Sequence, residues 1–322
     1  MSWNQAGKNI SGQFGMPLYG ISGLPPFTGN QFWVDETNGN DGNTGGPQDP
    51  FATLTQALSQ CTANNDDVVF LVGTLHATAT VAWSKNRTHL IGLCGASNVT
   101  SALISVSSVT ATSGAFSPLV NVTASGCLFQ NISALSGINQ AATQVCWAEV
   151  GGKNFYQGCS FNQVGHATAG AQAGNRALTI ASLQNTFMDC VIGGDQVIRA
   201  TGTNFTCEFL AGAGSSTFQA CTFQMYSTNT ANLHINALAS TLTGFILLDN
   251  CQLIQEVENA TAVTLAAAII ANASAGGAIL LTPTTISLGA TAIATTGPVY
   301  GVGMNPGGAN SATTNSIAIK FT

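Results

Sequence analysis

Three residues share one position in a repeating pattern and could carry acid–base chemistry. Asp195 and Glu256 each stand five residues after a regularly spaced cysteine, and Tyr226 holds the same position between them. If each repeat is one rung of strands, the two carboxyls lie about 9–10 Å apart. That separation suits the acid and base of an inverting glycosidase. The repeats hold seven carboxylates, so one shared position is also expected by chance, and solvated surface groups are the simpler interpretation.

A loop near the start of the chain is rich in oxygen ligands. Its candidate calcium ligands are Asp35, Asn38, Asn40 and Asp41. No glutamate closes the loop as in an EF-hand, and glycines at two positions make a plain turn sufficient, so turn chemistry is favoured over a metal site. The four histidines are dispersed, and we expect no cofactor.

The elements that position these groups repeat with a nearly fixed period. Cysteines recur at a spacing of about 31 residues, which falls in the range of stacked structural units: Cys94, Cys127, Cys159, Cys190, Cys221 and Cys251. The Val-, Ile-, Phe- and Thr-rich text between them, broken by Gly and Asn, predicts short strands. We therefore expect a parallel β-solenoid with a buried ladder of free cysteines.

An aromatic residue often precedes the repeated cysteine by three positions, as Tyr156, Phe187 and Phe218 do. Its parity is opposite to that of the cysteine in a regular strand. Either a bend separates the two residues, or the aromatics face outward into an interface. The sequence leaves both possibilities open.

The segments before and after the repeats differ in composition. Residues 31–93 predict a capping segment, with a short helix whose N-cap is Asp49 and whose first residue is Pro50, followed by the first coil. We expect coils over residues 94–290 and a C-terminal tail or cap over 291–322. Residues 316–322 read as a strand that either caps the last coil or pairs with another subunit.

Residues 1–30 read as an extended arm without a core of its own. Aromatic and apolar anchors are spaced along it: Trp3, Phe14, Tyr19, Leu24 and Phe27. Such anchors suit docking onto a neighbouring subunit. A disordered leader is the alternative.

Charge is scarce in the 322 residues. Only 6% of them are charged, and 7 Lys and Arg against 13 Asp and Glu give a net charge of −6. This balance argues against a nucleic-acid partner, and the apolar runs are too short for a membrane span. No charge occurs between Glu258 and Lys320, which indicates a surface covered by other subunits.

The capping segment resembles a known family. It contains Val-Asp-x-x-x-Gly-Asn-Asp-Gly from Val34, Pro-Phe-Ala-Thr-Leu-x-x-Ala-Leu from Pro50, and Asp-Asp-Val-Val-Phe-Leu-Val from Asp66. This text resembles the start of pectate-lyase-like right-handed parallel β-helices. With His76 and Ile-Gly-Leu-Cys-Gly from Ile91, it resembles more narrowly the pectate-lyase-like virion proteins of tailed phages. The close match covers residues 31–95.

The resemblance implies an all-β, right-handed parallel β-helix, for which the period gives about 6–8 coils of about 31 residues. It also implies a structural protein of the phage virion. We expect a non-enzymatic capsid decoration or cement protein, a homotrimer bound to the major capsid protein or other virion proteins and assembled in the host cytoplasm.

The alternative interpretation is a tailspike-like polysaccharide depolymerase that uses Asp195, Glu256 and Tyr226, or a host-glycan-binding fibre. Lyases of the resembled group bind calcium through clustered carboxylates and use a basic residue as the base. Arg176 and Arg199 form no ladder with the acids in the repeat count, so the lyase pattern is not reproduced.

Overall fold

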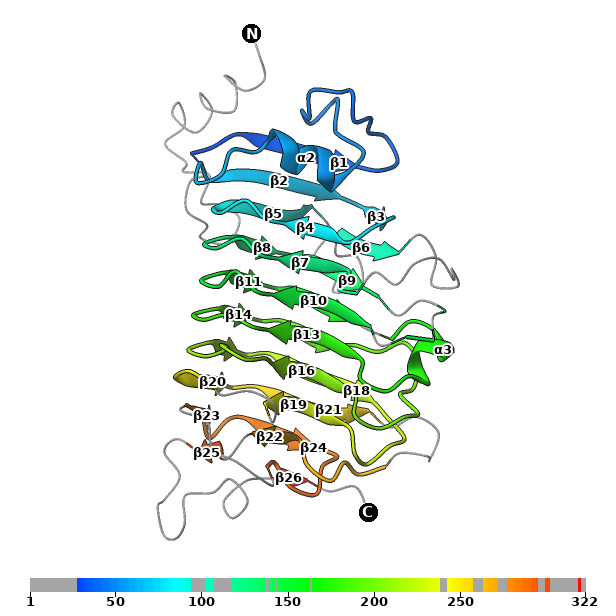
Figure 1. The fold of residues 1–322 in the computed structure, drawn as a ribbon, viewed down its shortest axis with the longest axis vertical. Coiled ribbons are helices and arrows are strands. Elements are labelled where there is room, and N and C mark those ends of the chain that lie inside the picture. The colour runs from blue at the N-terminus through cyan, green and yellow to red at the C-terminus, as the bar shows by residue number, and fades with distance from the viewer. Residues whose placement is uncertain are drawn as a thin grey trace.

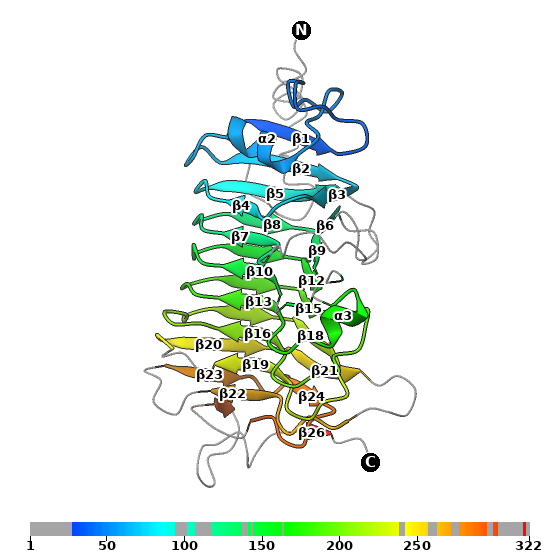
Figure 2. The same ribbon diagram turned by 45° about the vertical axis from the view of Figure 1, so that its right-hand side comes forward.

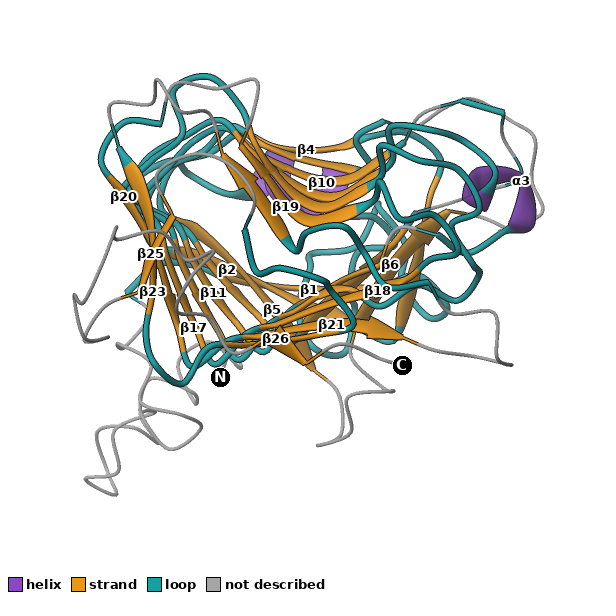
Figure 3. Cartoon of the chain, turned by 90° about the horizontal axis from the view of Figure 1, so that it is seen from below, coloured by secondary structure: helices purple, strands orange, loops and turns teal. Residues whose placement is uncertain are grey.

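The chain winds through three parallel sheets in turn, and the successive coils stack along one axis (Figures 1 and 2). The computed structural model describes residues 28–93, 102–106, 117–136, 139, 141–142, 144–162, 164–237, 242–256, 263–271, 277–294, 299–301 and 318–319. Viewed along the axis, the sheets surround one continuous core (Figure 3). The predicted all-β, right-handed parallel β-helix is confirmed.

Ten strands form the first sheet, here called sheet A. They are β1 (Gln31–Asp35), β2 (Asp67–Val72), β5 (Thr88–Leu93), β8 (Leu128–Gln130), β11 (Phe155–Gln157), β14 (Thr186–Met188), β17 (Thr217–Gln219), β20 (Phe245–Asp249), β23 (Ala278–Leu281) and β25 (Val299–Gly301).

The nine strands of sheet B follow those of sheet A along the chain. They are β3 (Thr74–Ala77), β6 (Ala102–Val106), β9 (Ile132–Leu135), β12 (Ser160–Asn162), β15 (Val191–Gly193), β18 (Thr222–Tyr226), β21 (Gln252–Glu256), β24 (Ile286–Leu288) and β26 (Ala318–Ile319). β26 pairs with β24, so this final strand extends the last coil of its own chain.

Seven strands complete the coils as sheet C. They are β4 (Val81–Trp83), β7 (Val120–Val122), β10 (Val145–Glu149), β13 (Arg176–Ile180), β16 (Phe205–Phe209), β19 (Leu233–Ala237) and β22 (Ile269–Ala271). The described helices are α2 (Leu54–Gln60) and α3 (Ala167–Gly170).

Aromatic side chains stack inside sheet A, which resolves the question of parity. The rings of Tyr156 and Phe187 lie 4.5 Å apart, and those of Phe187 and Phe218 lie 4.6 Å apart, with 4° between the planes in each pair. All three side chains are fully buried. The residue before Cys159, Cys190, Cys221 and Cys251 has a positive φ of 51–59° in each case, and this bend turns both the aromatic and the cysteine inward.

Four of the predicted ladder cysteines form the expected buried column at the bend between sheets A and B. They are Cys159, Cys190, Cys221 and Cys251. Each Sγ lies 3.4–3.7 Å from a backbone carbonyl of the preceding coil, so the thiol hydrogen has an acceptor. Burial raises the pKa of Cys190, which keeps that thiol protonated. The described cysteines are all free.

The predicted ladder is wrong at Cys127. The coil that leads to Cys159 is shorter than the period, because paired positions of β8 and β11 are 27 residues apart. Ile132 rather than Cys127 therefore takes the ladder position opposite Cys159. Cys127 lies five residues earlier, buried beside the carbonyl of Lys85. Cys94 lies outside the described residues. The 27-residue coil shows that the cysteine period matches the coils only where the loops keep a constant length.

The N-terminal cap contains the expected short helix, but the helix begins later than predicted. Thr53, not Asp49, is the N-cap of α2, and its side chain accepts a hydrogen bond from the N–H of Gln56. Leu54, Ala57 and Leu58 are buried against the first coil. The arm anchors Trp3, Phe14, Tyr19, Leu24 and Phe27 lie outside the described residues. Within the described ranges, no helix is long and apolar enough to span a bilayer.

A carboxyl group lies inside the coils at Glu149, near the end of β10. It accepts hydrogen bonds from the N–H of Gly152 at 2.7 Å, from the amide of Asn154, and from the hydroxyls of Tyr156 and Ser182. Burial raises the pKa of Glu149, and these donors oppose the shift.

We predict that replacing one ring of the aromatic stack destabilises the whole solenoid. Phe187→Ala removes a fully buried ring and leaves a cavity between two stacked neighbours, so the free energy of unfolding falls by about 3–5 kcal/mol. Denaturant unfolding measures this change. Thr186→Ala, on the outward side of the same strand, is the control and changes stability by less than about 0.5 kcal/mol. Equal effects of the two substitutions would contradict the inward packing.

Glu149 makes stability pH-dependent. Its folded-state pKa is raised, so its contribution is complete below the unfolded-state pKa and is lost as pH rises through the folded-state pKa. We expect a loss of up to about 1.4 kcal/mol per pH unit in that window, absent in Glu149→Gln. The glutamine amide places an N–H among groups that are already donors, so Glu149→Gln also changes the absolute stability. The comparison therefore uses the slope of the unfolding free energy against pH in wild type and variant. Parallel slopes would refute the buried-carboxyl assignment.

Candidate functional site

The outer side of sheet C carries a row of side chains from successive coils. Ala148 of β10, Thr179 of β13, Glu208 of β16 and Asn236 of β19 are neighbours in the paired register. The residues on either side of Thr179, Leu178 and Ile180, are in the main core. This row is therefore the face that sheet C presents outward.

A charged cluster lies on this face, formed by Arg176, Phe205, Glu208 and Asn236 and called here the Arg176–Glu208 cluster. The guanidinium carbon of Arg176 lies 4.1 Å from the centre of the Phe205 ring. Its Nε and Nη2 donate to the two carboxylate oxygens of Glu208. The amide of Asn236 donates to Oε1 of Glu208 at 2.8 Å.

The cluster is held rigidly and is only partly exposed to solvent. The side chains of Arg176 and Glu208 are 15% and 13% exposed. Two donors orient the carboxylate, and the stacked ring fixes the guanidinium. A carboxylate positioned in this way can transfer a proton to or from a bound molecule.

An amide ladder fixes the start of the strands that carry the cluster. The Oδ1 of Asn175, Asn204 and Asn232 each accepts a hydrogen bond from a backbone N–H of the preceding coil, at 2.9, 2.8 and 2.9 Å. All three side chains are buried. These residues immediately precede β13, β16 and β19, so the ladder sets the register in which Arg176 and Phe205 begin.

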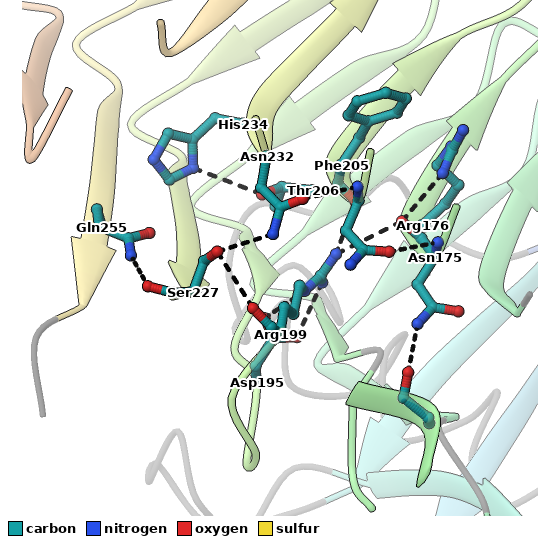
Figure 4. A network of polar contacts seen from close by, with 12 residues as sticks. Asn175, Arg176, Asp195, Arg199, Phe205, Thr206, Ser227, Asn232, His234 and Gln255 are labelled. Atoms are coloured by element: carbon teal, nitrogen blue, oxygen red, sulfur yellow. Dashed lines mark hydrogen bonds and ion pairs between the residues drawn. The ribbon is translucent and has the colours of Figure 1, made fainter. Parts of the chain in front are cut away.

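A buried ion pair supports the same backbone from inside. Nε and Nη2 of Arg199 donate to the carboxylate of Asp195 at 2.6 and 2.9 Å. Nη1 of Arg199 donates to the carbonyl of Phe205 at 3.1 Å. Figure 4 shows Arg199 extending from beside Asp195 toward the residues that begin the strands. The interior pair thus holds the backbone on which the outer cluster stands.

The depolymerase alternative assigned a catalytic role to Asp195, and the structure places this residue inside the solenoid. Its side chain is 0% exposed and both oxygens are taken by Arg199. Burial raises the pKa of Asp195, and Arg199 opposes that shift. A polysaccharide outside the solenoid cannot contact this carboxyl. Asp195 does stand five residues after Cys190, but the chain turns inward between β15 and β16 and carries the carboxyl into the interior.

The other two residues of that predicted set are brought together elsewhere. Tyr226 of β18 and Glu256 of β21 are direct neighbours in the paired register of sheet B, and both are half-buried on its outer side. The amide of Gln224 donates to Oε1 of Glu256. Tyr226 and Glu256 thus share a face from which Asp195 is absent.

The oxygen-rich loop uses its acceptors on its own backbone. Asp35 accepts hydrogen bonds from the N–H groups of Thr37 and Asn38. Asp41 accepts from the N–H groups of Ala52 and Thr53 just before α2, and Asn40 accepts from Gly42. These contacts favour turn chemistry over a calcium site. In the part of the chain that the structure describes, no three His, Cys, Asp or Glu side chains gather as metal ligands.

Sequence reasoning missed the Arg176–Glu208 cluster because positions were counted from the cysteines. The loops between sheets B and C vary in length, so residues at equal distances from their cysteines are no longer neighbours when the chain reaches sheet C. The available signal was the spacing of 32 residues between Arg176 and Glu208, close to one coil.

His234, also unassigned from sequence, lies on β19 behind this face (Figure 4). Its ring is fully buried, and burial lowers its pKa to about 3, so it is neutral.

Comparison with solved structures identifies the same architecture. A pectate lyase aligns with a TM-score of 0.56 and 14% identity, covering 81% of this chain and 64% of its own, so this chain spans less than two thirds of that lyase. A pectin methylesterase from Erwinia chrysanthemi aligns at 0.52 with 13% identity, covering 84% and 80%. One from Aspergillus niger aligns at 0.53 with 15% identity, covering 93% and 92%. No family model and no curated protein matches the chain.

These comparisons overturn the expectation of a non-enzymatic protein. Each of the three solved structures is an enzyme that acts on a pectic polysaccharide by name. At 13–15% identity, the likeness shows for this chain the pectate-lyase-like parallel β-helix fold.

We predict that the Asp195–Arg199 pair is required for folding rather than for contact with a ligand. Asp195→Ala leaves a buried guanidinium unpaired and lowers the free energy of unfolding by about 3–5 kcal/mol. Asp195→Ala combined with Arg199→Met recovers part of this loss. Denaturant unfolding checks both variants, with Glu256→Gln on the outer side of sheet B as the control at less than about 0.5 kcal/mol. A stable Asp195→Ala protein would argue against the structural role.

Proposed function

We propose that this chain is an enzyme that acts on a polysaccharide at the outer face of sheet C. The observation that carries the proposal is the Arg176–Glu208 cluster, a fixed and partly exposed carboxylate on an elongated sheet face. The row extends along the axis through Ala148 and Asn121 in one direction and Ile270 in the other. A long polymer can lie across several coils of such a face.

Glu208 is the proton-transferring group in this proposal. Asn236 and Arg176 orient its oxygens, and the Phe205 ring keeps Arg176 in place. Glycoside hydrolysis of the two-carboxylate kind requires a second carboxyl within about 10 Å. Glu208 is the only carboxylate on the described residues of this row, so the cluster fits reactions that need one acid–base carboxylate.

The comparisons support the substrate class at the level of polysaccharides. The solved structures of the same architecture include a pectate lyase and several pectin methylesterases, one of them in complex with a hexasaccharide. A shared fold alone does not fix an activity. The support comes from the fold together with the cluster on its outer face.

For the biological setting, we propose a tailspike-like role on a phage particle, with copies assembled as a homotrimer. The resemblance of residues 31–95 to phage virion proteins and the scarcity of charge support this setting. The comparisons give no support to capsid decoration, so we carry the tailspike-like alternative forward. Electron microscopy of the purified virion labelled with an antibody against this chain tests the location.

We predict that Glu208→Gln abolishes most of the activity. The protein is incubated with a panel of pectic, capsular and lipopolysaccharide glycans, and new reducing ends, unsaturated sugars and released ester alcohols are measured. On whichever glycan is converted, Glu208→Gln lowers turnover by about 10²–10⁴-fold, because the amide transfers no proton.

The matched control is Glu256→Gln on the outer side of sheet B, which we expect to retain wild-type turnover. Its unfolding curve and that of Glu208→Gln should overlay the wild-type curve. If the control variant is inactive while Glu208→Gln works normally, the active face is on sheet B and the proposal is wrong.

A further inference from the structure

We infer that the polysaccharide bound at the outer face of sheet C is uncharged, unlike the acidic polymer that a pectate lyase takes. This inference rests on the proposed function and narrows its substrate class. It is drawn from the partners of the described cationic side chains and from the neighbours of the Arg176–Glu208 cluster.

The arginines of the described residues are all committed to carboxylates. Arg87 pairs with Asp66, Arg176 with Glu208, and Arg199 with Asp195. The last of these pairs is fully buried. On the outer face of sheet C, the one guanidinium is therefore already neutralised by the carboxylate beside it.

The described lysines lie away from the cluster. Nζ of Lys85 donates to the carbonyls of Ser59 and Cys61 at 3.0 and 2.5 Å, at the C-terminal end of α2. Lys153 lies in the turn that follows β10, whereas Arg176 begins β13. Since the strands are parallel, these two residues lie at opposite ends of sheet C.

A polyuronate presents a carboxylate on every sugar, so its binding needs cations or bridging metal ions. The described residues contain no cluster of three metal-ligating His, Cys, Asp or Glu side chains, and the chain carries a net charge of −6. The carboxylate of Glu208 would repel an acidic sugar placed against it. The electrostatics of this face thus oppose an acidic polymer.

The neighbours of the cluster add no charge to this face. Thr179 and Asn236, the paired neighbours of Glu208, are uncharged and only 6% and 5% exposed. Phe205, Leu233 and Ala267 form a small apolar group separate from the main core, with Ile270 packed against it. A polymer placed beside Glu208 therefore meets uncharged polar and apolar groups, and the partly exposed Ile270 is the apolar side chain it can reach.

The test compares two forms of one polymer that differ only in charge. Homogalacturonan is used as the fully methyl-esterified, neutral form and as the de-esterified, acidic form, beside neutral glucans and N-acetylhexosamine polymers. Binding to the full-length protein is measured by affinity electrophoresis and calorimetry at low and high salt. We expect every bound glycan to be uncharged, with affinity changing by less than about twofold across a tenfold rise in salt.

Glu208→Gln provides an independent readout, because it releases the guanidinium of Arg176. We expect this variant to bind de-esterified homogalacturonan at least about fivefold more tightly than wild type at low salt, with the gain lost at high salt. Glu256→Gln removes a carboxylate on the outer side of sheet B and leaves the Arg176–Glu208 pair intact, so we expect no such gain at sheet C.

The outcomes separate this inference from the proposed function. Wild-type protein that binds the acidic form as well as, or better than, the neutral form overturns the inference while supporting a polysaccharide function. Binding to neutral polymers alone supports both. Absence of binding to every glycan overturns the proposed function and the inference together.

Discussion

The constraint on which this structure depends is that successive coils share one interior cross-section. Each strand inside a sheet is hydrogen-bonded to equivalent strands on both sides, so side chains of similar shape must stack at strand spacing. Tyr156, Phe187 and Phe218 do so with rings 4.5–4.6 Å apart and nearly parallel. One coil separates Gln130 from Gln157 by 27 residues and the next coil takes 31, yet the register of sheet A is continuous. The difference in coil length is taken up by the loops, because a strand of different length would break the stacking in the interior.

The same constraint decides where polar chemistry can occur. Inside, a carboxyl survives only with a full set of partners, as Glu149 has four donor groups and Asp195 has Arg199. Outside, Glu208 keeps its two donors and some exposure. Arg199 connects the two environments, since it donates to the carbonyl of Phe205, whose ring lies under Arg176. The buried pair is thus a positioning element for the outer cluster.

Sequence periodicity predicted the architecture well and the site poorly, for the same physical reason. The bend between sheets A and B has a constant length, so counting from Cys221 and Cys251 gives the true neighbours across that bend, as Tyr226 and Glu256 show. Beyond sheet B, the loops differ in length and direction. Asp195 therefore turns inward. Arg176 pairs with Glu208, although the two residues stand at different distances from their preceding cysteines. A positive φ at a non-glycine residue such as Asp189, which makes the bend, has no reliable sequence signal.

The scarcity of charge gives the fold and the candidate site a common explanation. A sheet face on a solenoid of this kind is long and regular, and unpaired charges repeated along it would lie one strand spacing apart and repel one another. Pairing Arg176 with Glu208, and building the rest of the row from Thr179 and Asn236, avoids that repulsion. The pectin enzymes share the winding of the chain, and their substrates do not follow from the winding. The charges on the outer face and their partners differ from one protein of this winding to another, so they have to be established for each chain by itself.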